Sequence, residues 1–151
     1  MPNSSNPSPK NSGDLSTSKL EHLIDNAPKC RPGESQIHGY GLIAFEVIKE
    51  GEIVIDFNDP NLYTEKKFSD LEPWRLEGGK YTGISEEKCL VSEAFTKYSL
   101  LNHSRQPNAV SNFKARHIVA IRDIFPGEEV TVDYRLEPVS PEAKTHIQHF
   151  L

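Results

Sequence analysis

The chain has 151 residues, of which 36% are hydrophobic and 26% are charged, a composition typical of one folded domain rather than of a disordered or fibrous protein. The formal net charge of −5 predicts no basic surface for phosphates, so direct binding of nucleic acid is not expected. The sequence shows neither a signal-peptide pattern nor a long apolar run, which predicts an intracellular protein that contacts no membrane. The expected location is the cytoplasm, or the nucleus or a host cell if the protein is a secreted effector.

The N-terminal part of the chain divides into two segments. Residues 1–18 are rich in Ser, Asn and Pro, and this composition predicts a disordered tail. Residues 19–34 are predicted to form a short helix, with Ser18 as its N-cap, followed by a linker. Cys30 and Cys89 are far apart and fit neither the spacing of zinc ligands nor a disulfide framework, so we expect no metal site.

The middle of the chain has the pattern of short β-strands. Between residues 35 and 57, runs of β-branched and aromatic residues separated by glycines predict two or three strands. Residues 59–79 are weakly patterned and predict a surface insertion with about one helical turn. A hairpin is predicted over residues 81–92, and residues 93–101 have the composition of a helix.

The last third of the chain predicts further strands and a helix. Alternation in residues 117–124 and the β-prone segment 129–134 predict strands joined by a turn at Pro126 and Gly127. The segment 137–151 is predicted to contain a short amphipathic helix that begins near Pro141.

Three short motifs carry the candidate chemistry. Residues 38–42 read His-Gly-Tyr-Gly-Leu, and two glycines around one residue let the backbone approach a ligand closely, although such a pattern also forms ordinary turns. Residues 102–108 read Asn-His-Ser-Arg-Gln-Pro-Asn; these are turn formers too, but an apolar pair precedes them and places their polar groups at the edge of a core. Residues 127–134 read Gly-Glu-Glu-Val-Thr-Val-Asp-Tyr, and the terminal tyrosine alone would suit simple packing.

In this order the motifs GxG, NHSxxPN and GEExTxDY resemble the signature of the SET-domain protein-lysine methyltransferases, with the small stand-alone bacterial or viral type as the nearest match in size. The resemblance covers residues 35–136. It implies a mainly β fold with short helices, the β-clip arrangement of small curved sheets, in which a C-terminal pseudoknot brings distant motifs together. Residues 137–151 would then take the place of the segment that follows the SET domain in relatives.

The resemblance also implies a site with two mouths, one for S-adenosylmethionine and one for a lysine side chain. The residues that match the family's cofactor-binding positions are Gly39, Tyr40, Gly41, Asn102 and His103. Tyr134 matches the tyrosine at the reacting centre, where it also meets the cofactor, and Tyr81 is predicted to form a wall of the lysine channel. Methyl transfer needs alignment of a neutral amine with the methyl carbon and exclusion of water, so Tyr134 is expected to orient the reactants rather than to act as a strong base.

The chain departs from the family pattern at several positions. Arg105 stands where relatives often have cysteine, and no cysteine-rich segment follows Tyr134, so the zinc-bound tail of many relatives is not expected. Val132 stands where some relatives carry the Phe or Tyr that limits the number of methyl groups added. His149 and Phe150 are candidates to cover the adenine, and an ordinary packing helix is the alternative.

We therefore predict transfer of a methyl group from S-adenosylmethionine to a lysine of a histone-like or other Lys-rich protein. One alternative is a catalytically silent SET-like module that keeps cofactor or peptide binding. Another is a β-rich interaction protein in which the three motifs occur by chance. The sequence does not decide whether the protein forms a homodimer.

Overall fold

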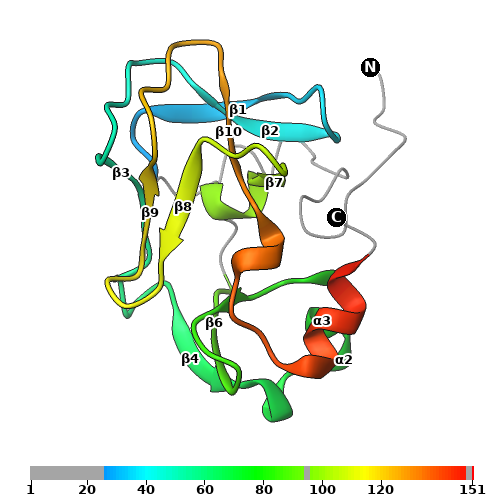
Figure 1. Ribbon diagram of the computed structural model, residues 1–151. Coiled ribbons are helices and arrows are strands. Elements are labelled where there is room, and N and C mark those ends of the chain that lie inside the picture. The colour runs from blue at the N-terminus through cyan, green and yellow to red at the C-terminus, as the bar shows by residue number, and fades with distance from the viewer. Residues whose placement is uncertain (1–25, 94–95, 149–150) are drawn as a thin grey trace.

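Three small β-sheets make up most of the structure, a computed structural model that describes residues 26–93, 96–148 and 151 (Figure 1). The strands are β1 (Cys30–Glu34), β2 (Tyr40–Ala44), β3 (Ile53–Asp56), β4 (Thr64–Lys67), β5 (Thr82–Gly83), β6 (Lys88–Val91), β7 (Asn102–His103), β8 (Ala109–Asn112), β9 (His117–Ala120) and β10 (Glu129–Val132). The helices are α2 (Pro73–Gly78) and α3 (Pro141–Ile147), with the 3-10 turns η1 (Phe68–Asp70), η2 (Lys97–Leu100) and η3 (Tyr134–Leu136). In the described ranges no helix combines the length and the apolar character needed to cross a membrane.

The first sheet, at the top of Figure 1, has the strand order β1-β2-β10-β7. Its central strand β10 comes from near the end of the chain but pairs antiparallel with β2, where Val130 lies opposite Leu42. On its other side β10 pairs in parallel with β7, where Thr131 lies opposite Asn102. This arrangement brings all three motifs to one sheet.

The loop after β7 crosses the inserted strand β10 and is fastened to it. The side-chain amide of Asn108 donates to the carbonyl of Glu129 at 2.8 Å, and its oxygen accepts from the backbone N–H of Thr131 at 2.9 Å. Asn108 is buried, so these two bonds satisfy polar groups that water cannot reach. The crossing of this loop and β10 is what the predicted pseudoknot requires.

Two clusters of buried side chains hold the sheets together. The larger one packs between the first sheet and the sheet β3-β9-β8, and includes Leu42, Ile55, Ile118 and Val130. The smaller one lies between the sheet β4-β6-β5 and the helices α2 and α3; its members are Phe68, Leu76, Tyr81, Cys89, Val91, Val139, Ala143 and Ile147. The segment predicted as a surface insertion therefore contributes to a core of its own.

Several predicted elements are confirmed. The hairpin appears as β5 and β6, with Thr82 opposite Leu90, and two strands, β2 and β3, occur between residues 35 and 57. The C-terminal helix α3 begins at Pro141, where the Ser140 hydroxyl accepts from the N–H of Ala143 as a cap.

Other elements differ from the prediction. The predicted linker before residue 35 contains β1, and the insertion contains β4 as well as α2. Within the predicted helix 93–101 the described residues form only the 3-10 turn η2. The predicted tail 1–18, the helix beginning at Ser18 up to residue 25, and His149 and Phe150 lie outside the described residues.

Candidate active site

The side chain of Asn102 ties the first motif to the second and the third. Its amide N–H₂ group lies 3.1 Å from the carbonyl of His38, 3.2 Å from that of Tyr40 and 2.8 Å from Oε2 of Glu129. The Ser35 hydroxyl is 3.1 Å away and itself donates to the Glu129 carboxylate at 2.8 Å. Asn102 is 2% exposed, so the geometry of the first motif depends on this buried amide.

The two glycines of the first motif have different roles. Gly39 has a φ of +51°, a left-handed conformation that glycine adopts without strain, and it forms the turn between β1 and β2. A Cβ on Gly41 would overlap the Glu129 carboxylate and would lie 3.2 Å from Cβ of Ser35. The space beside Gly41 is therefore filled by the Glu129 carboxylate, and this close contact explains why the residue is a glycine.

His103 lies on β7, the edge strand of the first sheet, and presents its main chain outward. The N–H of Ser104 donates to the carbonyl of Val132 at 3.0 Å. Because alternate residues of a parallel strand bond to the same neighbour, the N–H and C=O of His103 point to the side away from β10. A donor and an acceptor side by side at a sheet edge suit a planar heterocycle such as adenine.

The His103 ring is buried, and one of its nitrogens is available for a ligand. Nδ1 accepts from the backbone N–H of Tyr134 at 3.0 Å, so the neutral ring carries its proton on Nε2. Burial lowers the pKa of His103, and the nearby Asp133 opposes this only in part, which favours the neutral ring. Nε2 is buried and has no hydrogen-bond partner among the described residues. An unpartnered buried donor beside the outward-facing main chain fits a ligand that carries acceptor atoms.

Tyr134 begins η3 immediately after β10, and its side chain is buried against β7. Its hydroxyl donates to the carbonyl of Leu101 at 2.5 Å, and its ring lies 5.2 Å from the ring of His103. Burial, reinforced by the charges of Glu137 and Glu129, raises the pKa of the Tyr134 hydroxyl far above its ordinary value. The phenol therefore keeps its proton at neutral pH and is suited to orient a reactant rather than to remove a proton.

The sequence profile of the SET domain matches residues 39–135. The chain belongs to the SET-domain family. Two curated relatives are each 33% identical to it over 116 residues, which cover 68% of this chain. One is named as a candidate histone-lysine N-methyltransferase of Plasmodium falciparum, and the other is the histone-lysine N-methyltransferase TRX1 of Oryza sativa subsp. japonica.

The chain spans only 2% and 11% of the length of these two relatives, respectively. Among solved structures, the SET domain is similar to a humanized mutant of the Chaetomium thermophilum Polycomb Repressive Complex 2 bound to the inhibitor GSK126. The identity is 30% and the TM-score 0.52, over 68% of this chain and 14% of that chain. The predicted family and the mainly β fold are thus confirmed, and the small stand-alone type stays a prediction.

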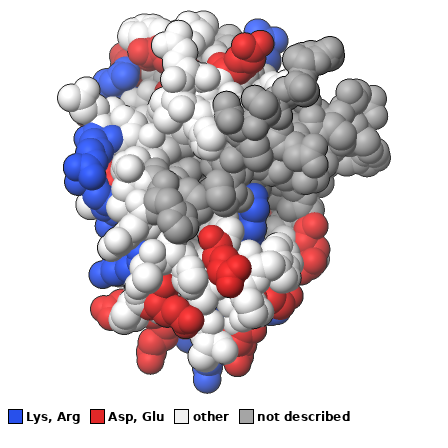
Figure 2. All heavy atoms as spheres, turned by 90° about the vertical axis from the view of Figure 1, so that its right-hand side faces the viewer, with Lys and Arg blue, Asp and Glu red and all other residues white. Residues whose placement is uncertain are grey.

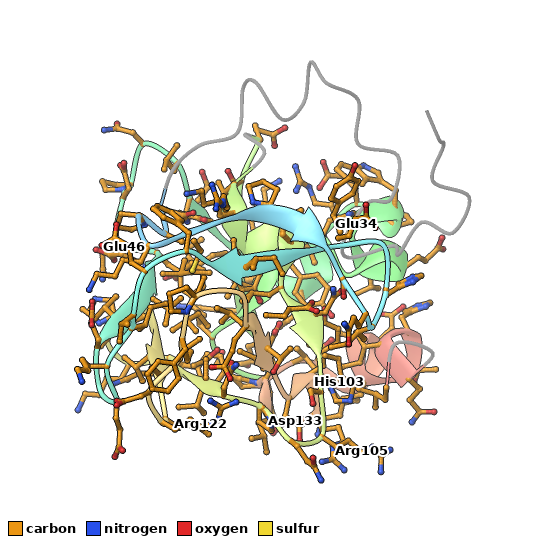
Figure 3. The ribbon with its side chains drawn as sticks, turned by 90° about the horizontal axis from the view of Figure 1, so that it is seen from above. Glu34, Glu46, His103, Arg105, Arg122 and Asp133 are labelled. Carbon is orange, nitrogen blue, oxygen red and sulfur yellow. The ribbon has the colours of Figure 1, made fainter. Side chains whose placement is uncertain are left out.

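Beside His103 the SET domain holds a fixed ion pair. Arg135 donates to both oxygens of Asp133, with its closest nitrogen 2.6 Å away, and lowers the pKa of that carboxyl to about 2. Figure 3 shows His103 and Asp133 close together, with Arg105 nearby on the outer side. Arg105, which departs from the family pattern, is exposed, and its charge adds to the causes that lower the pKa of His103, after burial and the charge of Arg135.

Tyr81, the second predicted catalytic residue, is placed apart from Tyr134. Its ring packs edge-on against Phe68 at 5.2 Å and belongs to the smaller core cluster, whereas Tyr134 belongs to the larger one. Burial first, and the charge of Glu137 second, raise the pKa of the Tyr81 hydroxyl. The assignment of Tyr81 to the lysine channel stays a prediction.

Sequence reasoning missed two residues that lie beside Tyr134: Glu137 and Tyr98. Glu137 follows η3, and its carboxylate accepts from the Tyr98 hydroxyl at 3.2 Å. Tyr98 stands in η2, three residues before the Leu101 carbonyl that binds Tyr134. Neither residue belongs to one of the three motifs, so no local pattern in the sequence pointed to them.

Proposed function

We propose that the SET domain transfers a methyl group from S-adenosylmethionine to the side-chain amine of a lysine in a histone-like or other Lys-rich protein. The observation that carries the proposal is the convergence of Asn102, His103 and Tyr134 from two motifs at one edge of the first sheet. The names of the curated relatives support lysine methylation, and Figure 2 shows acidic side chains gathered over the lower part of one face, which suits a cationic substrate.

The residues around β7 fit the cofactor. The main chain of His103 and its Nε2 offer donors and an acceptor, and the turn at Gly39 and Tyr40 is held beside them by the Asn102 amide. When bound, S-adenosylmethionine supplies a methyl carbon activated by a positively charged sulfur.

The protein's own residues would contribute to the reaction by aligning the lysine amine and by favouring the loss of its proton. The Tyr134 hydroxyl, fixed by the Leu101 carbonyl, would orient the amine. A lysine amine has a reference pKa of about 10.4, and entry into an apolar channel favours the neutral form that can attack carbon. Buried aromatic rings such as Tyr98 exclude water from this position.

The test is methyl transfer from labelled S-adenosylmethionine to a panel of histone and ribosomal proteins, read by mass spectrometry. On the best substrate, single-turnover rates of the wild type and of Tyr134→Phe are compared at matched cofactor saturation. Removing one oriented hydroxyl should slow transfer by about 100-fold to 1,000-fold and leave cofactor affinity unchanged.

Tyr63→Phe is the matched control, because Tyr63 is also a buried tyrosine whose hydroxyl bonds within the core, to Thr96 at 3.1 Å. Its loss should reduce stability slightly and leave the transfer rate at the wild-type level. Equal rates for wild type and Tyr134→Phe would make Tyr134 a packing residue. Cofactor binding without transfer on any protein of the panel would favour the silent module, and absence of cofactor binding would remove both.

A further inference from the structure

An open groove lies on the outer face of the first sheet. Leu42 and Val130 point into the larger core cluster. Because successive side chains of a strand point to opposite faces, their neighbours Ile43, Glu129 and Thr131 point outward. These three residues line the groove, whose volume of about 420 Å³ lies within the range of roughly 300 to 1,000 Å³ that is usual for ligand sites.

The walls of the groove come from separate segments of the chain. Gln36 follows β1, Gln106 follows β7, and both line the groove. Glu34 and Arg122 line it as well, and Figure 3, which looks down on the first sheet, shows these two side chains far apart. The core cluster that contains Tyr134 packs against the other face of the sheet. The groove is therefore elongated, and it faces away from the reacting tyrosine.

Four polar side chains of the groove make no side-chain hydrogen bond or ion pair within the described ranges. The Glu34 carboxylate and the amides of Gln36 and Gln106 are exposed. Thr131 is only 6% exposed, yet its hydroxyl has no hydrogen-bond partner among the described residues. A buried hydroxyl without a partner costs free energy unless a bound molecule or water reaches it. These groups are therefore available to a ligand.

The groove also carries unbalanced negative charge. Arg122 lies 3.3 Å from the Glu128 carboxylate, so these two opposite charges offset each other. Among the described residues, the Glu129 carboxylate accepts only from an uncharged hydroxyl and an uncharged amide, and the Glu34 carboxylate has no partner at all. Two negative charges remain, which favours a positively charged occupant.

We propose that this groove binds an extended segment of a partner protein, with a basic side chain that pairs with Glu34. The aliphatic part of the segment packs on Ile43 and on the half-exposed Ile37. The amides of Gln36 and Gln106 offer both donors and acceptors, as the main chain of a peptide requires. The inference goes beyond the proposed methyl transfer and does not depend on it, because the segment binds on the face away from the reacting tyrosine.

The experiment is a titration of the ¹⁵N-labelled full chain with the capped peptide acetyl-Arg-Val-Arg-Val-Arg-amide at constant ionic strength. The peptide contains no lysine, so it is no substrate for the proposed reaction. We expect saturable shifts of the Gly127 N–H and of the side-chain amides of Gln36 and Gln106, and no shift of Gly83 in the third sheet. A peptide with Gln in place of Arg should bind about tenfold more weakly.

Glu34→Lys reverses the unpaired charge, and it should fold normally because Glu34 is exposed. We expect it to bind the Arg peptide about tenfold more weakly than the wild type does. Glu46→Lys is the matched control: Glu46 is exposed, follows the opposite end of β2 and does not line the groove, and Figure 3 shows it far from Glu34. It should bind the peptide as the wild type does.

Two results would overturn the proposal directly: equal binding of the peptide by the wild type and Glu34→Lys, or equal binding of the Arg and Gln peptides. Shifts of the groove resonances on dilution of the protein alone would assign the groove to a second copy of the chain. Binding of free arginine as tight as that of the peptide would assign it to small cations, and either result would also overturn the proposal. Binding of the peptide through Glu34 in a protein that methylates nothing would refute the proposed function and leave this groove standing.

Discussion

Replacing Asn102 with alanine should remove the hydrogen bonds that connect the first motif, residues 38–42, to the second and third motifs. The buried amide reaches the carbonyls of His38 and Tyr40, the Ser35 hydroxyl and the Glu129 carboxylate, but it has only two hydrogens and makes two full bonds at a time. A bond to the charged carboxylate contributes about 2 kcal/mol and a neutral one about 1 kcal/mol, so Asn102→Ala should cost about 3 kcal/mol.

For a chain of this length, that loss lowers the Tm by roughly 6 to 12 °C. Cofactor affinity should fall as well, because the turn at Gly39 and the main chain of His103 are no longer held together. The assays are thermal unfolding followed by circular dichroism and calorimetric titration with S-adenosylmethionine. Asn61→Ala is the control, since Asn61 is exposed and should change stability by less than about 0.5 kcal/mol.

A second substitution at the same position tests the charge. Asn102→Asp keeps the shape but places a carboxylate against Glu129, so it should destabilise the protein more at neutral pH than at acid pH, where protonation relieves the repulsion. A Tm of Asn102→Ala within about 2 °C of the wild type, together with unchanged cofactor affinity, would refute the reasoning for both variants.

Two further predictions concern neighbours of this site. Gly41→Ala should lower the free energy of unfolding by about 1 to 3 kcal/mol, because the new methyl group overlaps the Glu129 carboxylate. In a double-mutant cycle measured by denaturation, Gly41→Ala combined with Glu129→Ala should lose less stability than the sum of the two single variants. Strict additivity would contradict the contact. Arg135 lowers the pKa of Asp133 to about 2, so the stability from this pair is present above pH about 4 and is lost as the pH falls toward about 2. Because Arg135 is half-exposed, solvent screens the pair and its contribution to stability is small. Urea unfolding between these pH values should show a smaller loss of stability in Arg135→Gln than in the wild type.

The sequence alone located the three motifs that the structure brings to one sheet. Asn102, His103 and Tyr134 could be named because their residue types recur at fixed spacing within local segments. That these residues come together was implied by the resemblance, whereas the individual contacts, such as the Tyr134 N–H bound to the His103 ring, are visible only in the structure. The hairpin and α3 could be predicted because a polar turn and a proline at the start of an amphipathic segment are local signals.

The remaining features depend on pairing partners that are distant in sequence. The strand β4 reads Thr-Glu-Lys-Lys and has no apolar alternation; it is a strand because β6 pairs with it along its whole length. The strand β1 contains Pro32 and Gly33, which are unfavourable inside a sheet but acceptable at an edge. Glu137 became visible only through its bonds to Gly83 and Tyr98, which belong to other elements.

The position of β10 has a consequence for how the chain is made. Val130 and Thr131 fill the middle of a sheet whose other strands leave the ribosome much earlier. Until then, β2 presents an open edge on which another chain can add a strand. Pairings across such long stretches of sequence form slowly. The domain should therefore reach its native state only after β10 has left the ribosome, and a nascent chain stalled before Glu129 should aggregate rather than accumulate as a partly active domain.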